Sequence, residues 1–348
     1  IGMIFIFLCY TYSCKESDED FDVCLDYDKD IQKDAIILSN NPVELPDDYI
    51  YAEKFWMISD TMLAISNRRE AGNFLDIVNP VDGKIYSSLL KYGEGPDEMI
   101  MCGLYYDGQY FTAVDYARSR YAKFTPHEAS RPEFKPRYID YPREIGVTSP
   151  PICIGDTTYI VNPYHYINKS NDIIQDVERF LIITENDLDP INIERELLYT
   201  QNVDQVVPLA DEINGHIWLL RRERSIIDIY NYNTEKIKSV KIKDELDRDP
   251  DVIVDDRSVI YYAGYPSAYL NAIIDYDYNE ILTVYCGKLE TPDMVEKTPS
   301  KIIVFDIDGN FKRAYACGSY ICSLSKATDG ISAPIYDDEA MPLFVKLE

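Results

Sequence analysis

Short apolar runs separated by turn residues recur along most of the chain. The runs are rich in β-branched and aromatic side chains, which suit pleated and half-buried strands. The first unit contains four such runs, at residues 55–59, 61–66, 73–78 and 84–90. An Asp-Gly pair at Asp82-Gly83 stands between the last two and favours a tight turn. This order predicts a four-stranded antiparallel meander.

The same pattern returns along the rest of the chain. Further units cover about residues 103–139, 152–199, 206–242, 270–316 and 321–348. Their turns contain Asp107-Gly108, Asn214-Gly215 and Asp308-Gly309, which are strong hairpin signals. Helical periodicity is almost absent. Repeated four-stranded units without helices predict an all-β fold, a six-bladed β-propeller, with five or seven blades as alternatives.

The two ends of the repeat predict how the ring closes. The last unit, 321–348, has room for only three strands, and an early apolar run at residues 35–38 has no partner in the first unit. Pairing of this N-terminal strand with the C-terminal blade would complete the blade and cover a free sheet edge. We therefore expect one propeller domain over residues 34–348.

The N-terminus has the pattern of an export signal. An uncharged apolar run from Met3 to Leu8 is followed by the small residue Ser13, by Cys14 and by the acidic run 16–20. The run is too short to span a bilayer and matches a secretory signal. The Ser13-Cys14 junction resembles the cleavage site of bacterial lipoproteins, which implies a signal peptide over residues 1–13 and lipid attachment at Cys14. An ordinary secretory signal is the alternative.

The residues after Cys14 predict the location of the folded domain. We expect residues 14–33 to be an acidic lipoprotein tether, with the protein in the cell envelope as an outer-membrane lipoprotein, at the surface or facing the periplasm. The acidic run resembles the signal that sends some lipoproteins to the cell surface. The membrane is then a partner through the lipid anchor.

The net charge of the chain limits which other partners we expect it to bind. The chain has 61 acidic and 34 basic residues, and its formal net charge is −27. Binding of nucleic acid needs a basic surface, so we expect no nucleic-acid partner. A solvated acidic surface also favours a soluble domain, which we expect to be a monomer.

One turn resembles a known family. Gly93, Gly95, Pro96 and Glu98 match the Gly-x-Gly-Pro-Gly-Glu turn of the TolB-like six-bladed β-propeller lipoproteins of bacteria, with Asp97 where the family usually has Gly. The hairpin at 304–309 is also similar to that family. The resemblance implies the propeller fold and the lipoprotein address. It carries over no catalytic residue.

Two aromatic runs are the candidate ligand-binding residues. They are Tyr164, His165 and Tyr166 in the third unit and the pair Tyr261 and Tyr262 before the fifth. Tyrosine rings on the loop face of a propeller can hold a sugar or a peptide, since they combine an apolar face with a hydroxyl. Packing of these rings between blades is the alternative interpretation.

No cofactor is expected, with calcium as the alternative. Asp275, Asp277 and Asn279 have the spacing that opens an EF-hand loop. Glu280 and Cys286 stand where that loop needs Gly and a bidentate Glu, so a surface turn is the better interpretation.

No catalytic signature is present in the sequence. There is no nucleophile elbow and no phosphate-binding Gly-rich loop, and none of the three histidines belongs to a metal-binding pair. The pattern favours a non-enzymatic binding or interaction module for a glycan, a peptide or a partner protein. A propeller hydrolase or lyase acting on polysaccharide or peptide is the alternative, because propeller enzymes assemble their sites from several blades.

Overall fold

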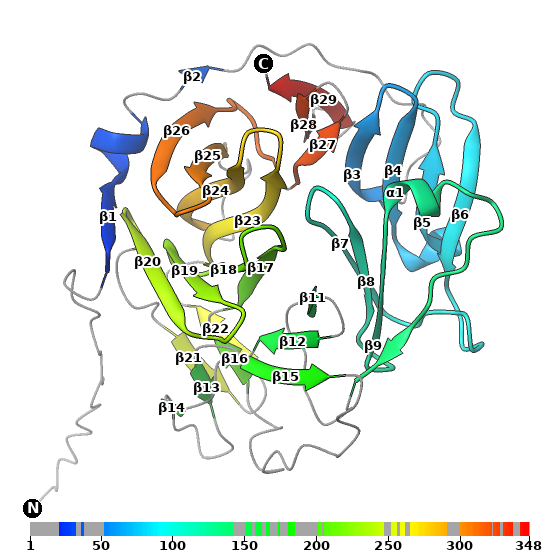
Figure 1. Ribbon diagram of the computed structural model, residues 1–348, viewed down its shortest axis with the longest axis horizontal. Coiled ribbons are helices and arrows are strands. Elements are labelled where there is room, and N and C mark those ends of the chain that lie inside the picture. The colour runs from blue at the N-terminus through cyan, green and yellow to red at the C-terminus, as the bar shows by residue number, and fades with distance from the viewer. Residues whose placement is uncertain are drawn as a thin grey trace, which may run out of the picture.

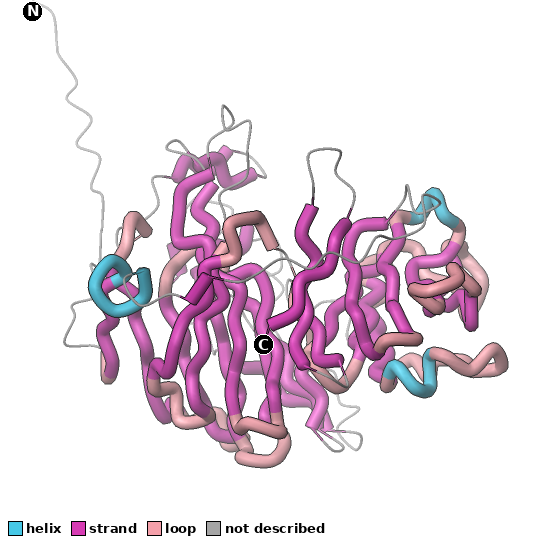
Figure 2. The backbone as a smooth tube through the Cα atoms, turned by 90° about the horizontal axis from the view of Figure 1, so that it is seen from above, coloured by secondary structure: helices cyan, strands magenta, loops and turns pink. Residues whose placement is uncertain are grey.

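The protein is a ring of β-sheets arranged around a central axis (Figure 1). The computed structural model describes residues 21–32, 36–37, 52–141, 150–154, 157–161, 165–167, 173–174, 180–184, 201–203, 205–246, 252–255, 258–261, 265–290, 300–321, 323–327, 330–336 and 342–347. Figure 2 shows the strands crossing the thickness of the ring and the few helical turns at its edge. These turns are Tyr27–Gln32, Arg69–Ala71 and α1, Pro126–Ala129.

The first half of the ring follows the chain as antiparallel meanders. The first sheet consists of β3 (Ala52–Ser59), β4 (Met62–Asn67), β5 (Asn73–Val78) and β6 (Ile85–Lys91). The second consists of β7 (Cys102–Tyr106), β8 (Phe111–Asp115), β9 (Arg120–Phe124) and β10 (Ile139–Asp140). The third contains β11 (Ile152–Ile154), β12 (Thr157–Val161) and β15 (Phe180–Thr184).

The second half repeats this organisation. One sheet contains β17 (Val206–Asp211), β18 (His216–Arg221), β19 (Ile226–Asn231) and β20 (Lys236–Lys243). The next contains β23 (Tyr265–Asp275), β24 (Glu280–Glu290), β25 (Lys301–Asp306) and β26 (Phe311–Ala316). The last contains β27 (Ser325–Ala327), β28 (Gly330–Tyr336) and β29 (Pro342–Leu347).

Two small sheets lie beside the ring (Figure 1). One contains β13 (His165–Ile167), β14 (Ile173–Ile174) and β16 (Gln201–Val203). The other contains β21 (Val252–Asp255) and β22 (Ser258–Tyr261). They are additions to the expected meanders.

Contacts between first strands build the ring. β11 contacts β17, β17 contacts β23, β23 contacts β27, and β27 contacts β3 of the first sheet. The first strand of each sheet therefore faces the axis, and later strands step outward. This confirms the prediction of an all-β propeller.

The closure differs in one respect from the prediction. The early strand β2 (Ile36–Ile37) does pair with a C-terminal sheet, but its neighbour is β26, in parallel register. The final sheet, β27–β29, is not its partner and instead contacts β3 of the first sheet. The edge that needed cover was that of β26, because β26 is the outermost strand of its own meander.

Part of the segment predicted as a tether packs against the domain. Residues of β1 (Val23–Asp26) pair in parallel with β20, and the turn Tyr27–Gln32 follows at once. Ile31 has no exposed surface and belongs to the largest apolar cluster. The acidic composition of the segment gave no indication of this short apolar contact. The signal peptide and Cys14 lie outside the described residues.

Aromatic side chains join neighbouring sheets. Trp56 of β3 meets Phe111 of β8 with ring centroids 5.5 Å apart, and Trp218 of β18 meets Phe305 of β25 at 6.4 Å. Both tryptophans are almost completely buried. The Trp56–Phe111 pair is edge-on, and such aromatic contacts stabilise an interface beyond the area that they bury.

The turn that carries the family resemblance is held by two arginines. Arg118 Nη1 donates to the carbonyls of Gly95 and Glu98 at 2.6 and 2.7 Å. Arg120 Nη1 donates to the carbonyl of Pro96 at 2.7 Å, and its Nη2 donates to Glu98 O. The Glu98 carboxylate accepts the amide of Gly95 at 2.8 Å. The motif is therefore a rigid structural turn beside the second sheet.

Candidate functional site

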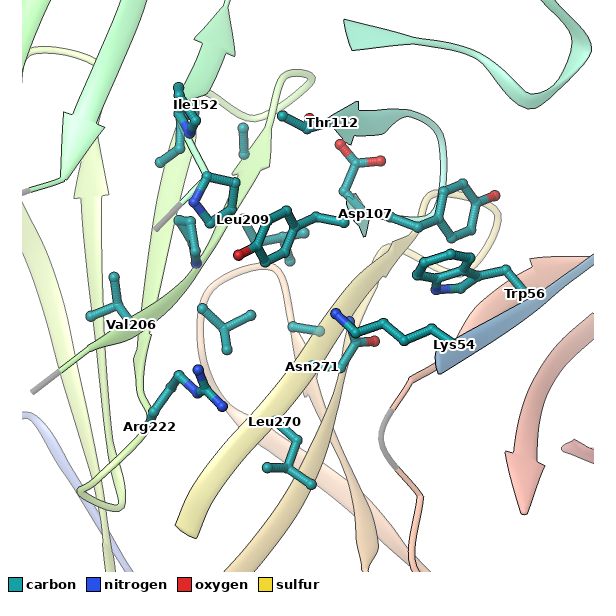
Figure 3. Close-up of a pocket in the computed structure, with 18 of the residues that line it drawn as sticks. Lys54, Trp56, Asp107, Thr112, Ile152, Val206, Leu209, Arg222, Leu270 and Asn271 are labelled. Atoms are coloured by element: carbon teal, nitrogen blue, oxygen red, sulfur yellow. The ribbon is translucent and has the colours of Figure 1, made fainter. Parts of the chain in front are cut away.

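A pocket of about 230 Å³ lies at the centre of the ring. Its walls come mainly from the first strands of five sheets, β3, β7, β11, β17 and β23, with Thr112 of β8 and Lys123 of β9. Loops supply Arg222, just after β18, and Tyr320, after β26. Figure 3 shows the lining side chains around this space. We call it the channel pocket, because it occupies the axis of the propeller.

The lining combines apolar walls with a few polar groups. Proline and aliphatic side chains of β11, β17 and β23 form much of the wall. The charged groups in it are Lys54, Asp107, Lys123 and Arg222. This composition is typical of small-molecule sites, in which apolar walls exclude water and few polar groups fix orientation.

One end of the pocket contains Asp107 and Lys123, and each is engaged by other groups of the protein. Asp107 Oδ1 accepts the amides of Gln109 and Tyr110 at 2.8 and 2.6 Å, so this carboxylate shapes the β7–β8 turn. Burial raises the pKa of Asp107, and these two hydrogen bonds oppose the rise. Lys123 Nζ forms an ion pair with Glu212 at 2.7 Å.

The other end contains the cations Lys54 and Arg222 and the aromatic ring of Tyr105. Lys54 Nζ lies over the ring of Tyr105, 5.2 Å from its centroid. The Tyr105 hydroxyl shares a hydrogen bond of 2.5 Å with the hydroxyl of Tyr116. Burial raises the pKa of Tyr105, whereas the hydrogen bond with Tyr116 and the nearby charge of Arg222 lower it. Tyr105, Lys54 and Arg222 therefore belong to the same lining of the pocket.

Hydrogen bonds to backbone and side-chain groups of the protein position the polar groups at this end. Lys54 Nζ donates to the carbonyl of Leu104 at 3.4 Å. Arg222 Nη1 donates to Oε1 of Gln205 at 3.1 Å. Asn271 Oδ1 accepts the amide of Leu324 at 3.0 Å, which turns its NH₂ group away from that contact. These anchors hold the side chains before any ligand arrives.

The predicted aromatic residues fall in the small sheets. His165 and Tyr166 belong to β13, and Tyr261 belongs to β22, while Tyr164 and Tyr262 lie outside the described residues. The two strands are brought near each other, since β16 pairs with β13 and contacts β22. Their role in ligand binding stays a prediction.

A lysine pairs with both aspartates of the acidic turn weighed for calcium. Lys326 Nζ lies 2.7 Å from Asp275 and 3.0 Å from Asp277. The amide of Asp277 donates to Asp275 Oδ1 at 3.1 Å, as in an ordinary turn. Across the described ranges, no three His, Cys, Asp or Glu side chains gather as a metal site. No helix in those ranges is long and apolar enough to cross a membrane.

The sequence patterns missed the residues of the channel pocket. Lys54 and Trp56 are two positions apart in β3, so they lie on one side of that strand. The sequence did offer one signal for this site: a lysine stands two positions before a tryptophan on the first strand of a unit. Arg222 and Asn271 carry no comparable signal, because only the closed ring brings them near Lys54.

Comparison with known proteins gives likeness of fold. No protein-family model and no curated protein matches the chain. Among solved structures, a DUF4221 family member from Bacteroides vulgatus superposes with a TM-score of 0.57 at 9% identity, covering 90% of this chain and 98% of that one. A predicted exported protein from Bacteroides fragilis superposes with a TM-score of 0.50 at 13% identity, covering 93% and 98%. Identities this low show a shared fold alone.

Proposed function

We propose that this protein is an exported, six-bladed propeller that binds a small ligand in the channel pocket without transforming it. The observation that carries this proposal is the pocket itself, an open space at the axis with polar groups from several sheets. A channel filled with apolar side chains would have argued against binding. The six meandering sheets, counted from β3 to β29, support the number of blades.

Export rests on two independent indications. The apolar run from Met3 to Leu8 and the Ser13-Cys14 junction have the pattern of a lipoprotein signal. The similar Bacteroides fragilis structure belongs to a predicted exported protein. Both indications support our proposal that the domain belongs to the cell envelope and is anchored to the outer membrane through Cys14. Fatty-acid labelling of cells should mark the wild-type chain and leave the Cys14→Ser variant unlabelled.

The enzymatic alternative has less support from the pocket. Glycoside hydrolysis uses two carboxyl groups that flank the scissile bond. Asp107 is the one carboxylate among the described lining residues, and its Oδ1 is engaged by the β7–β8 turn. A binding site needs no such pair, so binding explains the described lining with fewer assumptions.

The test is a glycan and peptide array probed with the full chain and with two pocket-filling variants. Val207→Phe and Leu270→Phe each place a ring in the pocket from a different strand. Lys84→Met, at an exposed position, is the control. We expect saturable binding of at least one array member by the wild type and control, and its loss in both filled variants.

Two outcomes would contradict the proposal. Binding that survives both filled variants would place the ligand elsewhere on the propeller. Turnover of a bound glycan or peptide would favour the hydrolase or lyase. Thermal unfolding of each variant establishes that it is folded before its binding is interpreted.

A further inference from the structure

The charge of the channel pocket is opposite to that of the whole chain. The chain carries a formal net charge of −27. Yet Lys54, Tyr105 and Arg222 all line this pocket, and the Lys54 ammonium lies over the Tyr105 ring. Figure 3 shows both side chains directed into the pocket, from β3 and from the end of β18. Two cationic side chains in one confined pocket of an acidic protein indicate a specific role in binding.

The charge of Arg222 is not balanced locally. Its Nη1 donates to the neutral amide oxygen of Gln205, and its backbone groups pair with Gln205 and Ala268. Within the described part of the chain, Arg222 forms no ion pair with a carboxylate. At the far end, by contrast, Lys123 is paired with Glu212. Arg222 is therefore a pocket cation that no carboxylate of the described residues pairs with, and Lys54 belongs to the same lining.

Two like charges in a confined space repel each other more strongly than they would in water. An anion between them removes this repulsion and gains charge-assisted hydrogen bonds. The planar guanidinium of arginine matches the geometry of a carboxylate, which it binds through two parallel hydrogen bonds. A ligand with one carboxylate therefore suits this end of the pocket.

The remaining lining limits the body of the ligand. A volume of about 230 Å³ lies below the usual range of about 300–1,000 Å³ for drug-sized ligands, so one small ring or chain fits. Asn271, Thr112 and the hydroxyl of Tyr320 add neutral polar groups along the walls. Such groups suit hydroxyl-bearing ligands better than purely apolar ones.

We propose that the channel pocket binds a small carboxylate of the size of one acidic sugar, with its carboxylate between Lys54 and Arg222. The inference rests on the proposed function, whose site it uses. Glucuronate is the probe that this chemistry favours. Glutamate tests whether an amino acid is the source of the carboxylate instead.

The test is isothermal titration calorimetry of the full chain. The probes are glucuronate, glutamate, inorganic phosphate and, as the neutral match, glucose. We expect glucuronate to bind and glucose to bind at least about tenfold more weakly, because glucose lacks the charge-assisted contacts. Lys54→Met and Arg222→Met should each weaken glucuronate binding by about tenfold or more.

Matched variants separate charge from folding. Lys84→Met and Arg137→Met remove exposed cations outside the pocket and should leave binding unchanged. Lys54→Arg and Arg222→Lys keep the charge and should retain part of the binding, which tests the inference even where a methionine variant fails to fold. The affinity of the charge-keeping variants for glucuronate should therefore lie between that of the wild type and that of the methionine variants.

The outcomes distinguish this inference from the proposed function. Equal binding of glucose and glucuronate, or tighter binding of phosphate, would overturn the carboxylate inference. So would the absence of heat with both carboxylates. In each case a neutral array ligand that is lost in Val207→Phe and Leu270→Phe would keep the proposed function. If pocket filling also changes nothing on the array, both proposals fail.

Discussion

At the scale of single residues, several contacts hold the side chain of Arg120 beside the second sheet. Its guanidinium lies 3.6 Å from the completely buried carboxylate of Asp115 and 4.1 Å from the ring of Tyr138. Asp115 also accepts the amides of Ile100 and Met101, each at 3.3 Å. One ion pair thus connects the 93–98 turn to the core of the sheet.

Replacement of Arg120 by methionine should strongly destabilise the fold. Removing one partner of a buried ion pair leaves an uncompensated charge and typically costs about 3–5 kcal/mol. Urea denaturation should show a lower midpoint, with Arg137→Met, at an exposed position, within about 0.5 kcal/mol of wild type. Adding Asp115→Asn to Arg120→Met should recover part of the loss, because the stranded charge disappears. An unchanged midpoint for Arg120→Met would contradict this account.

Glycines in the hairpins allow a matched comparison. Gly215 and Gly309 have φ angles of +74° and +78°, the left-handed region that their Asn-Gly and Asp-Gly turns require. A Cβ on Gly215 would meet nothing within 4 Å, whereas one on Gly309 would lie 2.6 Å from Cδ1 of Ile229. The two sites therefore differ in packing but share their backbone strain.

We expect Gly215→Ala to cost about 1–2 kcal/mol, the penalty of a left-handed conformation for an L-residue. Gly309→Ala should cost more, because its methyl group also displaces Ile229. Chemical denaturation of both variants gives the difference directly. Equal losses would mean that Ile229 moves aside freely.

Local chemistry explains why these turns were predictable from the sequence. A positive φ depends on a glycine and its neighbours alone, so Gly83, Gly108, Gly215 and Gly309 all occupy the predicted turns. The hold of Arg120 on Pro96 was not predictable, because it joins residues that only the folded sheet brings together.

At the scale of elements, Glu280 connects the start of β24 to β26. Its two oxygens accept Nη1 and Nη2 of Arg313, both at 2.7 Å, and Lys312 adds a third contact. Burial alone would raise the pKa of Glu280. The hydrogen bonds from Arg313 and Lys312 outweigh burial and hold the pKa below its ordinary value of 4.5.

This shift predicts how stability depends on pH. Because the pKa is lower in the folded chain, ionised Glu280 stabilises the fold above about pH 4.5, and this contribution is lost as the pH falls through the folded-state pKa. Glu280→Gln should therefore be less stable than wild type at pH 7, and the gap should narrow below about pH 4.5. Urea midpoints from pH 7 to pH 3 measure the gap. Glu133→Gln, at an exposed position, is the control, and a gap that does not change with pH would contradict the prediction.

The positions of the strands were more predictable from the sequence than the pairing between distant strands. Apolar runs with turn residues between them identified the meanders of β3–β6 and β17–β20, because strand pairing inside a meander is local. The parallel partners β1 and β2 were not predictable in the same way. β1 pairs with β20 and β2 pairs with β26, each about two hundred residues or more away in the chain. The sequence of neither short strand indicates which distant strand it pairs with.

At the scale of the whole molecule, the same reasoning applies to the candidate site. The ring predicted from the repeats implies a central channel, but the register of each first strand decides which side chain enters it. Lys54, Tyr105 and Asn271 stand on three different sheets. Their convergence is a property of the closed ring, whereas the aromatic runs stand out because they are local in the sequence.

The N-terminal segment also acts at this scale, as a strap across two outer edges. Residues 23–26 cover β20, residues 36–37 cover β26, and Asp22 accepts the amide of Ser239 at 2.7 Å. Ile31 lies completely buried between these two pairings in the sequence and packs in the cluster that contains Val240 and Ile242. The strap therefore covers strand edges that would otherwise be open to other chains.

Removal of residues 1–51 should destabilise the ring and promote association. Exposing the site of Ile31 alone costs about 1.5–3 kcal/mol of apolar burial, and the unpaired edges of β20 and β26 become templates for other strands. Removal of residues 1–20 retains the strap and should leave the free energy of unfolding within about 0.5 kcal/mol of that of the full chain. Denaturation and light scattering of the two truncated chains test the difference. If both behave alike, closure of the ring depends on contacts between first strands, such as β27 with β3, and the strap adds nothing to it.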